Sequence, residues 1–151
     1  MITTVKGVSP LARAVRMDKA SIAGLTATLH HYWRGEALNK VPVWRMIATP
    51  LAEIEKRARR WARAIGQDAR IVDGRSMIGG GSLPEESLPT KLLAINGEGG
   101  YVAELARRLR TGDPAVVARV EHDALLMDPR TVRPDEDRAL IAAAKAALEA
   151  A

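Results

Sequence analysis

Two arginines near the start of the chain, Arg13 and Arg16, are close enough in sequence to bind one anion together. At a spacing of i,i+3 they share one face if the segment is helical, and paired guanidinium groups can hold a multivalent oxyanion through forked hydrogen bonds. On spacing alone, the favoured interpretation is that both pair with carboxylates at the surface. The pair is therefore a candidate anion site, but its spacing alone does not favour anion binding over surface ion pairs.

Few other residues can support metal, thiol or disulfide chemistry. The chain has no Cys, and two of its three His, His30 and His31, are adjacent, which makes a poor metal set. We therefore predict no metal site and no catalytic residue in this chain. The first residues lack the apolar core of a signal peptide, and no apolar run has membrane-spanning length, so we expect a soluble, cytoplasmic protein.

The charge balance is basic, with 23 Lys and Arg against 18 Asp and Glu and a net charge of +5 over 151 residues. This charge is compatible with an acidic partner such as RNA, although an Arg- and Ala-rich chain also arises from genome base composition. With no Phe, three Trp and two Tyr, the chain has few rings on which bases could stack. A surface that reads an oligonucleotide is therefore not expected.

The hydrophobic periodicity changes along the chain from helical to extended and back. Ser9 and Pro10 are typical of a helix start, and residues 35–42 are expected to form a break. Helices are expected over 18–33, 50–65, 100–112 and 135–150, and strands over 69–78, 90–96, 115–121 and 124–128, the last two joined as a hairpin at 122–123. This order predicts an α+β fold, with about four strands covered by helices.

The two N-terminal helices differ in the faces they present. In the helix over 18–33, Ile22, Leu25 and Leu29 lie on one side and need more cover than a small sheet supplies alone, so an exposed apolar patch is expected there. The helix over 50–65 has an apolar stripe and a basic face; the stripe is Leu51, Ile54, Ala58, Trp61 and Ile65, and the basic residues are Lys56, Arg57, Arg60 and Arg63. A solvated basic face, with a Glu53–Arg57 pair, is favoured over an RNA contact.

The stretch "GGGSLPEESLPT", residues 79–90, joins two of the expected strands. A nucleotide-binding P-loop needs Gly, four residues and then Gly-Lys-Ser or Gly-Lys-Thr, whereas here Gly81 is followed by Ser82, Leu83 and Pro84. Glycines permit left-handed backbone and prolines fix φ, so the loop has a defined shape. We expect a connection between strands and no phosphate cradle.

Two long stretches together resemble the carboxy-terminal part of bacterial selenocysteine synthases, the L-seryl-tRNA(Sec) selenium transferases. They are "SPLARAVRMDKASIAGLTATL" and "IVDGRSMIGGGSLPEESLPT". "VPVWRMIATPLAEIEKRA" and "LARRLRTGDPAVVARVEHDALLMDPRTV" agree with the same family in order. The resemblance covers nearly the whole chain, and its Pro-Leu-x-Arg-Ala-x-Arg-x-Asp-Lys and Gly-Gly-Gly-Ser-Leu-Pro signatures are specific to the family and its near relatives.

The resemblance implies the small carboxy-terminal domain of a fold-type-I pyridoxal-phosphate enzyme. In that family a large domain holds pyridoxal 5'-phosphate on a lysine, and serine attached to its tRNA loses its hydroxyl and gains selenium from selenophosphate. The chain lacks the cofactor lysine and the large domain, so it is expected to be inactive alone and to bind no cofactor alone. We expect residues 1–48 to be a linker and helix from the large domain, and 49–151 to be the small domain.

The resemblance also assigns Arg13 and Arg16 to the binding of the selenium-donor anion, which reverses the preference drawn from spacing. Lys19 is rejected as the cofactor lysine because that lysine lies upstream of the motif, and the roles of Asp18 and Lys19 stay open. Seryl-tRNA(Sec), selenophosphate and further copies of the enzyme are the expected partners. Two alternatives stay open: a related ammonia-lyase acting on an amino sugar acid phosphate, and a non-catalytic basic module that binds tRNA or protein.

Overall fold

The structure is a computed structural model that describes residues 16–79, 83–98 and 100–150. Its contacts divide the chain between Arg45 and Met46 into two compact units, and each is described separately below. Among the described residues, no helix is both long enough and apolar enough to cross a membrane.

The described part of the first unit, residues 16–45, is mostly helical. Helix α2 spans Lys19–Trp33, as the periodicity predicts, and is followed by the short helix α3, Ala37–Lys40. Helix α4 begins in this unit at Pro42 and ends in the second unit at Ala48. The expected break over 35–42 is only partly correct: Gly35 has a φ of +69°, but α3 forms one further helical turn before Pro42. The prediction of a helix start at Ser9 and Pro10 falls outside the described residues.

The second unit contains one antiparallel sheet of strand order β1-β2-β4-β3. The strands are β1 Ala69–Gly79, β2 Leu83–Asn96, β3 Arg119–Glu121 and β4 Ala124–Met127. His122 and Asp123 both have positive φ, 48° and 56°, which suits a two-residue hairpin turn between β3 and β4. The predicted hairpin is confirmed.

Two strand boundaries differ from the sequence prediction. Strand β2 begins at Leu83 instead of residue 90, although it includes Pro84 and Pro89. Because β4 pairs only with Leu93–Asn96 of β2, the first half of β2 has one free edge, where a missing N–H is tolerated. Strand β3 begins at 119 instead of 115, because the preceding segment turns back to α6, where the Val116 N–H donates to the Leu109 carbonyl at 2.8 Å.

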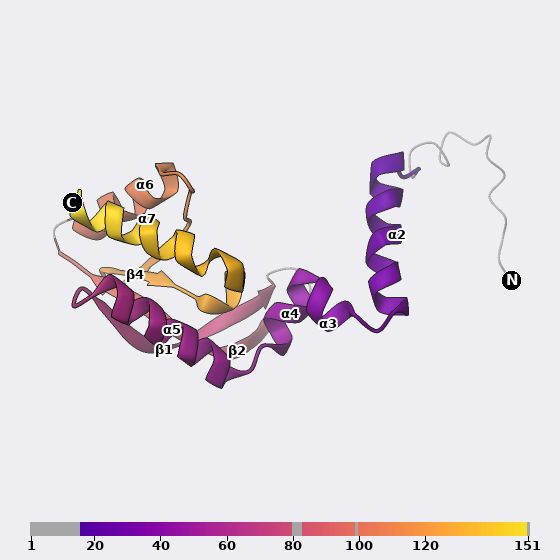
Figure 1. Cartoon of the computed structure of the whole chain (residues 1–151), viewed down its shortest axis with the longest axis horizontal. Helices are drawn as coiled ribbons and strands as arrows, with labels where there is room; N and C mark the ends of the chain where they lie inside the picture. Colours follow the sequence, from indigo (N-terminus) through magenta and orange to yellow (C-terminus); the bar gives the residue numbers. More distant parts are fainter. Residues whose placement is uncertain (1–15, 80–82, 99, 151) are drawn as a thin grey trace, which may run out of the picture. The chain divides into compact units, whose positions relative to one another are not determined.

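Three helices build the core with the sheet. Helices α5 (Leu51–Ile65), α6 (Tyr101–Thr111) and α7 (Asp137–Glu149) match the predicted helices to within a few residues, and the 3₁₀ turns η1 (Pro129–Thr131) and η2 (Pro134–Glu136) precede α7. Helix α7 contacts both α5 and α6, and Figure 1 shows these helices lying along the sheet. The buried core comprises Trp61, Ile65, Leu93, Ile95, Val102, Leu105, Leu109, Leu125, Met127, Leu140, Ala144 and Ala147. The predicted α+β class is confirmed.

Candidate functional site

The predicted anion site lies at the edge of the described part of the chain. Arg13 is outside the described residues, so its geometry relative to Arg16 stays a prediction. Arg16 is exposed and precedes α2 in a segment without regular secondary structure. Among the described residues, Arg16 forms no hydrogen bond or ion pair, so no described carboxylate neutralises it.

Asp18, the carboxylate nearest in sequence to Arg16, caps helix α2. Its Oδ1 accepts hydrogen bonds from the backbone N–H groups of Ala20 at 2.8 Å and Ser21 at 3.0 Å, and its Oδ2 accepts one from the Ser21 hydroxyl at 2.6 Å. The hydroxyl of Ser21, followed by its backbone N–H, lowers the pKa of Asp18. The structure thus gives Asp18 a capping role, and Lys19 is the exposed first residue of the helix.

None of the residues of helix α2 is buried, and all except His31 are exposed. Ile22, Leu25 and Leu29 are 50%, 49% and 54% exposed, which confirms the predicted apolar patch. Residues 20–33 include no Asp, Glu, Lys or Arg, whereas a helix that faces water normally carries charge on its outer side. This surface has the composition of a helix that is covered by other protein.

Aromatic and imidazole groups gather where α2 ends. The indole N–H of Trp44 donates to the Tyr32 hydroxyl, and His31 Nδ1 lies 3.2 Å from a carboxylate oxygen of Glu36. Within the described ranges, no group of three His, Cys, Asp or Glu is placed to hold a metal ion. Trp33 is exposed beside His30, so these rings extend the apolar surface of α2.

Arg57, predicted to lie on the solvated face of α5, points inward instead. Its guanidinium forms an ion pair with Asp137 at 2.6 Å, and the two side chains are each 7% exposed. It also donates to the backbone carbonyls of Pro129 at 2.6 Å and Val132 at 2.9 Å, and it lies over the ring of Trp61. The expected Glu53–Arg57 pair is therefore wrong, because η1 and the start of α7 pack on that side of α5 and supply Asp137.

A second buried arginine, Arg130 of η1, was not identified from the sequence. Its guanidinium donates to the carbonyls of Met46 at 2.7 Å and Pro89 at 2.7 Å, which ties η1 to the end of α4 and to β2. Burial lowers the pKa of Arg130, and nearby Asp128 opposes that shift. Asp128 in turn accepts hydrogen bonds from the hydroxyls of Ser76 and Thr90 and from the Arg130 N–H. These contacts hold η1 against α4, β1 and β2, although the buried Nε of Arg130 has no hydrogen-bond partner among the described residues.

A cavity of about 520 Å³ lies between the β1–β2 hairpin, the segment before β3 and the start of α7. Apolar side chains such as Met77, Val117 and Leu126 line much of it. Its polar lining groups already have partners within the chain: Arg75 with Ser87, Arg119 with Glu121, Ser76 with Asp128, Thr131 with the Asp128 carbonyl, and Glu136 with the Arg133 N–H. Arg75 bonds only to the hydroxyl and carbonyl of Ser87, so among the described lining groups it is a cation that no carboxylate neutralises.

The glycine-rich loop joins β1 to β2, as expected, and its residues 80–82 lie outside the described ranges. Closer to the sheet, Gly74 of β1 faces the side chain of Leu92, and a Cβ at Gly74 would lie 2.4 Å from Leu92 Cδ1. The absence of a side chain at Gly74 lets Leu92 pack against β1.

The chain is similar to known proteins over most of its length. The family model for L-seryl-tRNA selenium transferase matches residues 1–133. The chain is 43% identical over 131 residues to an L-seryl-tRNA(Sec) selenium transferase of Nitratidesulfovibrio vulgaris, covering 82% of this chain and 28% of that protein. For the transferase of Desulfovibrio desulfuricans the identity is 37% over 158 residues, covering 98% of this chain and 33% of the relative. The chain thus spans about three-tenths of the length of these relatives.

Proposed function

The chain belongs to the L-seryl-tRNA selenium transferase family, and from this premise we propose that it is the carboxy-terminal part of an enzyme that converts seryl-tRNA(Sec) to selenocysteinyl-tRNA(Sec). The match over residues 1–133 carries the proposal. The composition of α2 supports it, because a helix without Asp, Glu, Lys or Arg after Lys19 and without a buried residue is suited to burial against the rest of a longer protein. On this view, residues 1–48 connect a large domain to a small domain formed by 49–151.

We also propose that pyridoxal phosphate is held by the part of the enzyme outside this chain. Lys91 forms an ion pair with Asp73 at 2.5 Å, and this hydrogen bond raises the pKa of Lys91. The other described lysines, Lys19, Lys40, Lys56 and Lys145, are exposed, and no lysine lines the cavity. We therefore assign the cofactor, the chemistry that it supplies and its lysine to the remainder of the enzyme.

The proposed contribution of this chain is to bind the selenium donor. Arg13 and Arg16 would supply two guanidinium groups to selenophosphate, whose several oxyanion oxygens suit forked donors. The capping role of Asp18 supports this assignment, because its carboxylate is already held by three hydrogen bonds. The proposal also includes assembly into a homo-oligomer and a cytoplasmic location, where aminoacyl-tRNA is made.

A chimera tests the proposal. This chain would replace the matching segment of the Nitratidesulfovibrio vulgaris transferase, and formation of selenocysteinyl-tRNA(Sec) would be measured with selenophosphate as donor. We expect the chimera to be active and this chain alone to be inactive. The Arg13→Ala/Arg16→Ala variant should raise the KM for selenophosphate at least tenfold, since about 1.4 kcal/mol of lost binding is tenfold in affinity. A folded, cofactor-loaded chimera without activity would refute the proposal.

A further inference from the structure

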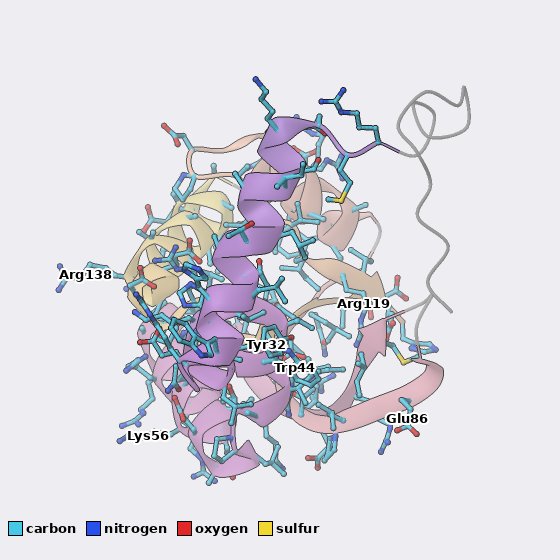
Figure 2. The ribbon with its side chains drawn as sticks, turned by 90° about the vertical axis from the view of Figure 1, so that its right-hand side faces the viewer. Tyr32, Trp44, Lys56, Glu86, Arg119 and Arg138 are labelled. Carbon is cyan, nitrogen blue, oxygen red and sulfur yellow. The ribbon has the colours of Figure 1, made fainter. Side chains whose placement is uncertain are left out.

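The outer surfaces of α5 and α7 form a basic surface that the proposed donor site does not use. We define the α5–α7 cationic face as Lys56, Arg59, Arg60, Arg63 and Arg138, all of which are exposed. Figure 2 shows Lys56 of α5 and Arg138 of α7 projecting to the same side of the molecule. The ion pair between Arg60 and Asp137, which precedes Arg138 in the chain, joins the two helices at this face.

The balance of charges distinguishes this face from an ordinary solvated helix. Arg57 turns inward and its charge balances that of the buried Asp137 carboxylate. Arg60 pairs with the same carboxylate and therefore adds a cation in excess. Helix α5 has two carboxylates, the exposed Glu53 and the half-buried Glu55, of which Glu55 pairs with Arg59 at 2.5 Å. Of the five cations of this face, Arg59 and Arg60 have carboxylate partners, and Lys56, Arg63 and Arg138 form no ion pair with any described residue.

Helix α6 gives an internal comparison. There Arg107 and Arg108 both bind Glu104, at 2.7 Å and 2.8 Å, and together they lower the pKa of Glu104 to about 2. Cations on α6 are therefore partly neutralised within the helix. On the α5–α7 cationic face, Asp137 is shared by Arg57 and Arg60, but the remaining cations Lys56, Arg63 and Arg138 have no described carboxylate partner, so their field extends into solvent.

The spacing of the cations suits a phosphate backbone. Lys56, Arg60 and Arg63 follow one another at i, i+4 and i+7, which places them on one stripe at intervals of about 6 Å and about 4.5 Å along the helix axis. The aromatic residue of this helix, Trp61, is buried, so it offers no ring for base stacking. A surface of this kind binds phosphates without reading the base sequence.

We infer that the α5–α7 cationic face binds the phosphate backbone of the tRNA substrate. The inference rests on the proposed function for the identity of the RNA, and it reverses the preference for a solvated face drawn from the sequence. The structure supplies the reason, since it turns Arg57 inward and brings Arg138 to this face. Arg138 belongs to α7, which begins 80 residues after Arg57 in the chain. The contact would orient the tRNA and would leave recognition of its sequence to other parts of the enzyme.

The test measures binding of fluorescent tRNA(Sec) to this chain between 50 and 200 mM KCl (about the range in which phosphate contacts change affinity most clearly). The Lys56→Gln/Arg63→Gln variant removes two charges and spares Arg60, which pairs with Asp137. We expect the slope of log K against log salt to fall by about 1.4 to 1.8, and the affinity at low salt to fall by about tenfold. The matched control, Arg107→Gln/Arg110→Gln on α6, should change the slope by less than about 0.5.

The inference is overturned if both variants change the slope equally, or if the chain shows no salt-dependent affinity for tRNA. It is also overturned if polyglutamate binds at the same residues more tightly than tRNA, because the partner is then an acidic protein. The chimera separates this result from the proposed function. If the chimera is active and the α5 variant leaves its KM for tRNA unchanged, the surface assignment fails alone. If the face binds tRNA and the chimera is inactive, the surface assignment stands and the enzymatic proposal fails.

Discussion

The buried pair of Arg57 and Asp137 allows a quantitative prediction about stability. The Asp137→Ala substitution would remove the carboxylate and leave the Arg57 guanidinium buried beside Trp61. Breaking a buried pair on one side typically costs 3 to 5 kcal/mol, whereas exposed pairs contribute about 0 to 1 kcal/mol. Because Arg57 would keep its bonds to the Pro129 and Val132 carbonyls, we expect a loss near the lower limit, about 3 kcal/mol.

The assay is urea unfolding followed by circular dichroism, with the free energy of unfolding extrapolated to water. The control is Glu121→Ala, which breaks the exposed Arg119–Glu121 pair of the hairpin and should cost less than about 1 kcal/mol. The double variant Arg57→Met/Asp137→Leu, which removes both charges, should be more stable than Asp137→Ala alone. Equal losses for Asp137→Ala and Glu121→Ala would show that water reaches the pair, and the reasoning from burial would then be wrong.

Two further predictions concern α6 and β1. The Glu104 carboxyl should titrate near pH 2 in an NMR pH titration, since Arg107 and Arg108 lower its pKa to about 2. Because that pKa lies below the unfolded value of 4.5, the stabilisation is present above pH 4.5 and is lost as the pH falls towards 2; a titration near 4.5 would contradict the pairing. The Gly74→Ala substitution should cost about 1 to 3 kcal/mol, because its Cβ would overlap Leu92. The Leu92→Ala substitution removes the side chain that the new Cβ would overlap. Gly74→Ala should therefore lower the free energy of unfolding by less in the Leu92→Ala variant than in the unchanged chain, which a double-mutant cycle would measure.

The sequence predicted the elements whose signals are local. The apolar stripe that ends before Gly66 placed α5, and the two short runs rich in Val and Leu on either side of residues 122–123 placed the β3–β4 hairpin. The family motifs carried the functional proposal, because they depend on residue identity and order. The exposed apolar side of α2 was also predicted, since its periodicity and its lack of charge are both visible in the chain.

The tertiary structure decided features that depend on distant neighbours. Pro84 and Pro89 predict a break, yet β2 tolerates them because β4 does not reach that half of the strand. Arg57 has the same local surroundings as the exposed cations of α5, and only the packing of η1 and α7 turns it inward to Asp137. Periodicity shows which side of a helix is apolar, but the partner of each polar side chain is set by elements that fold against it from elsewhere in the chain.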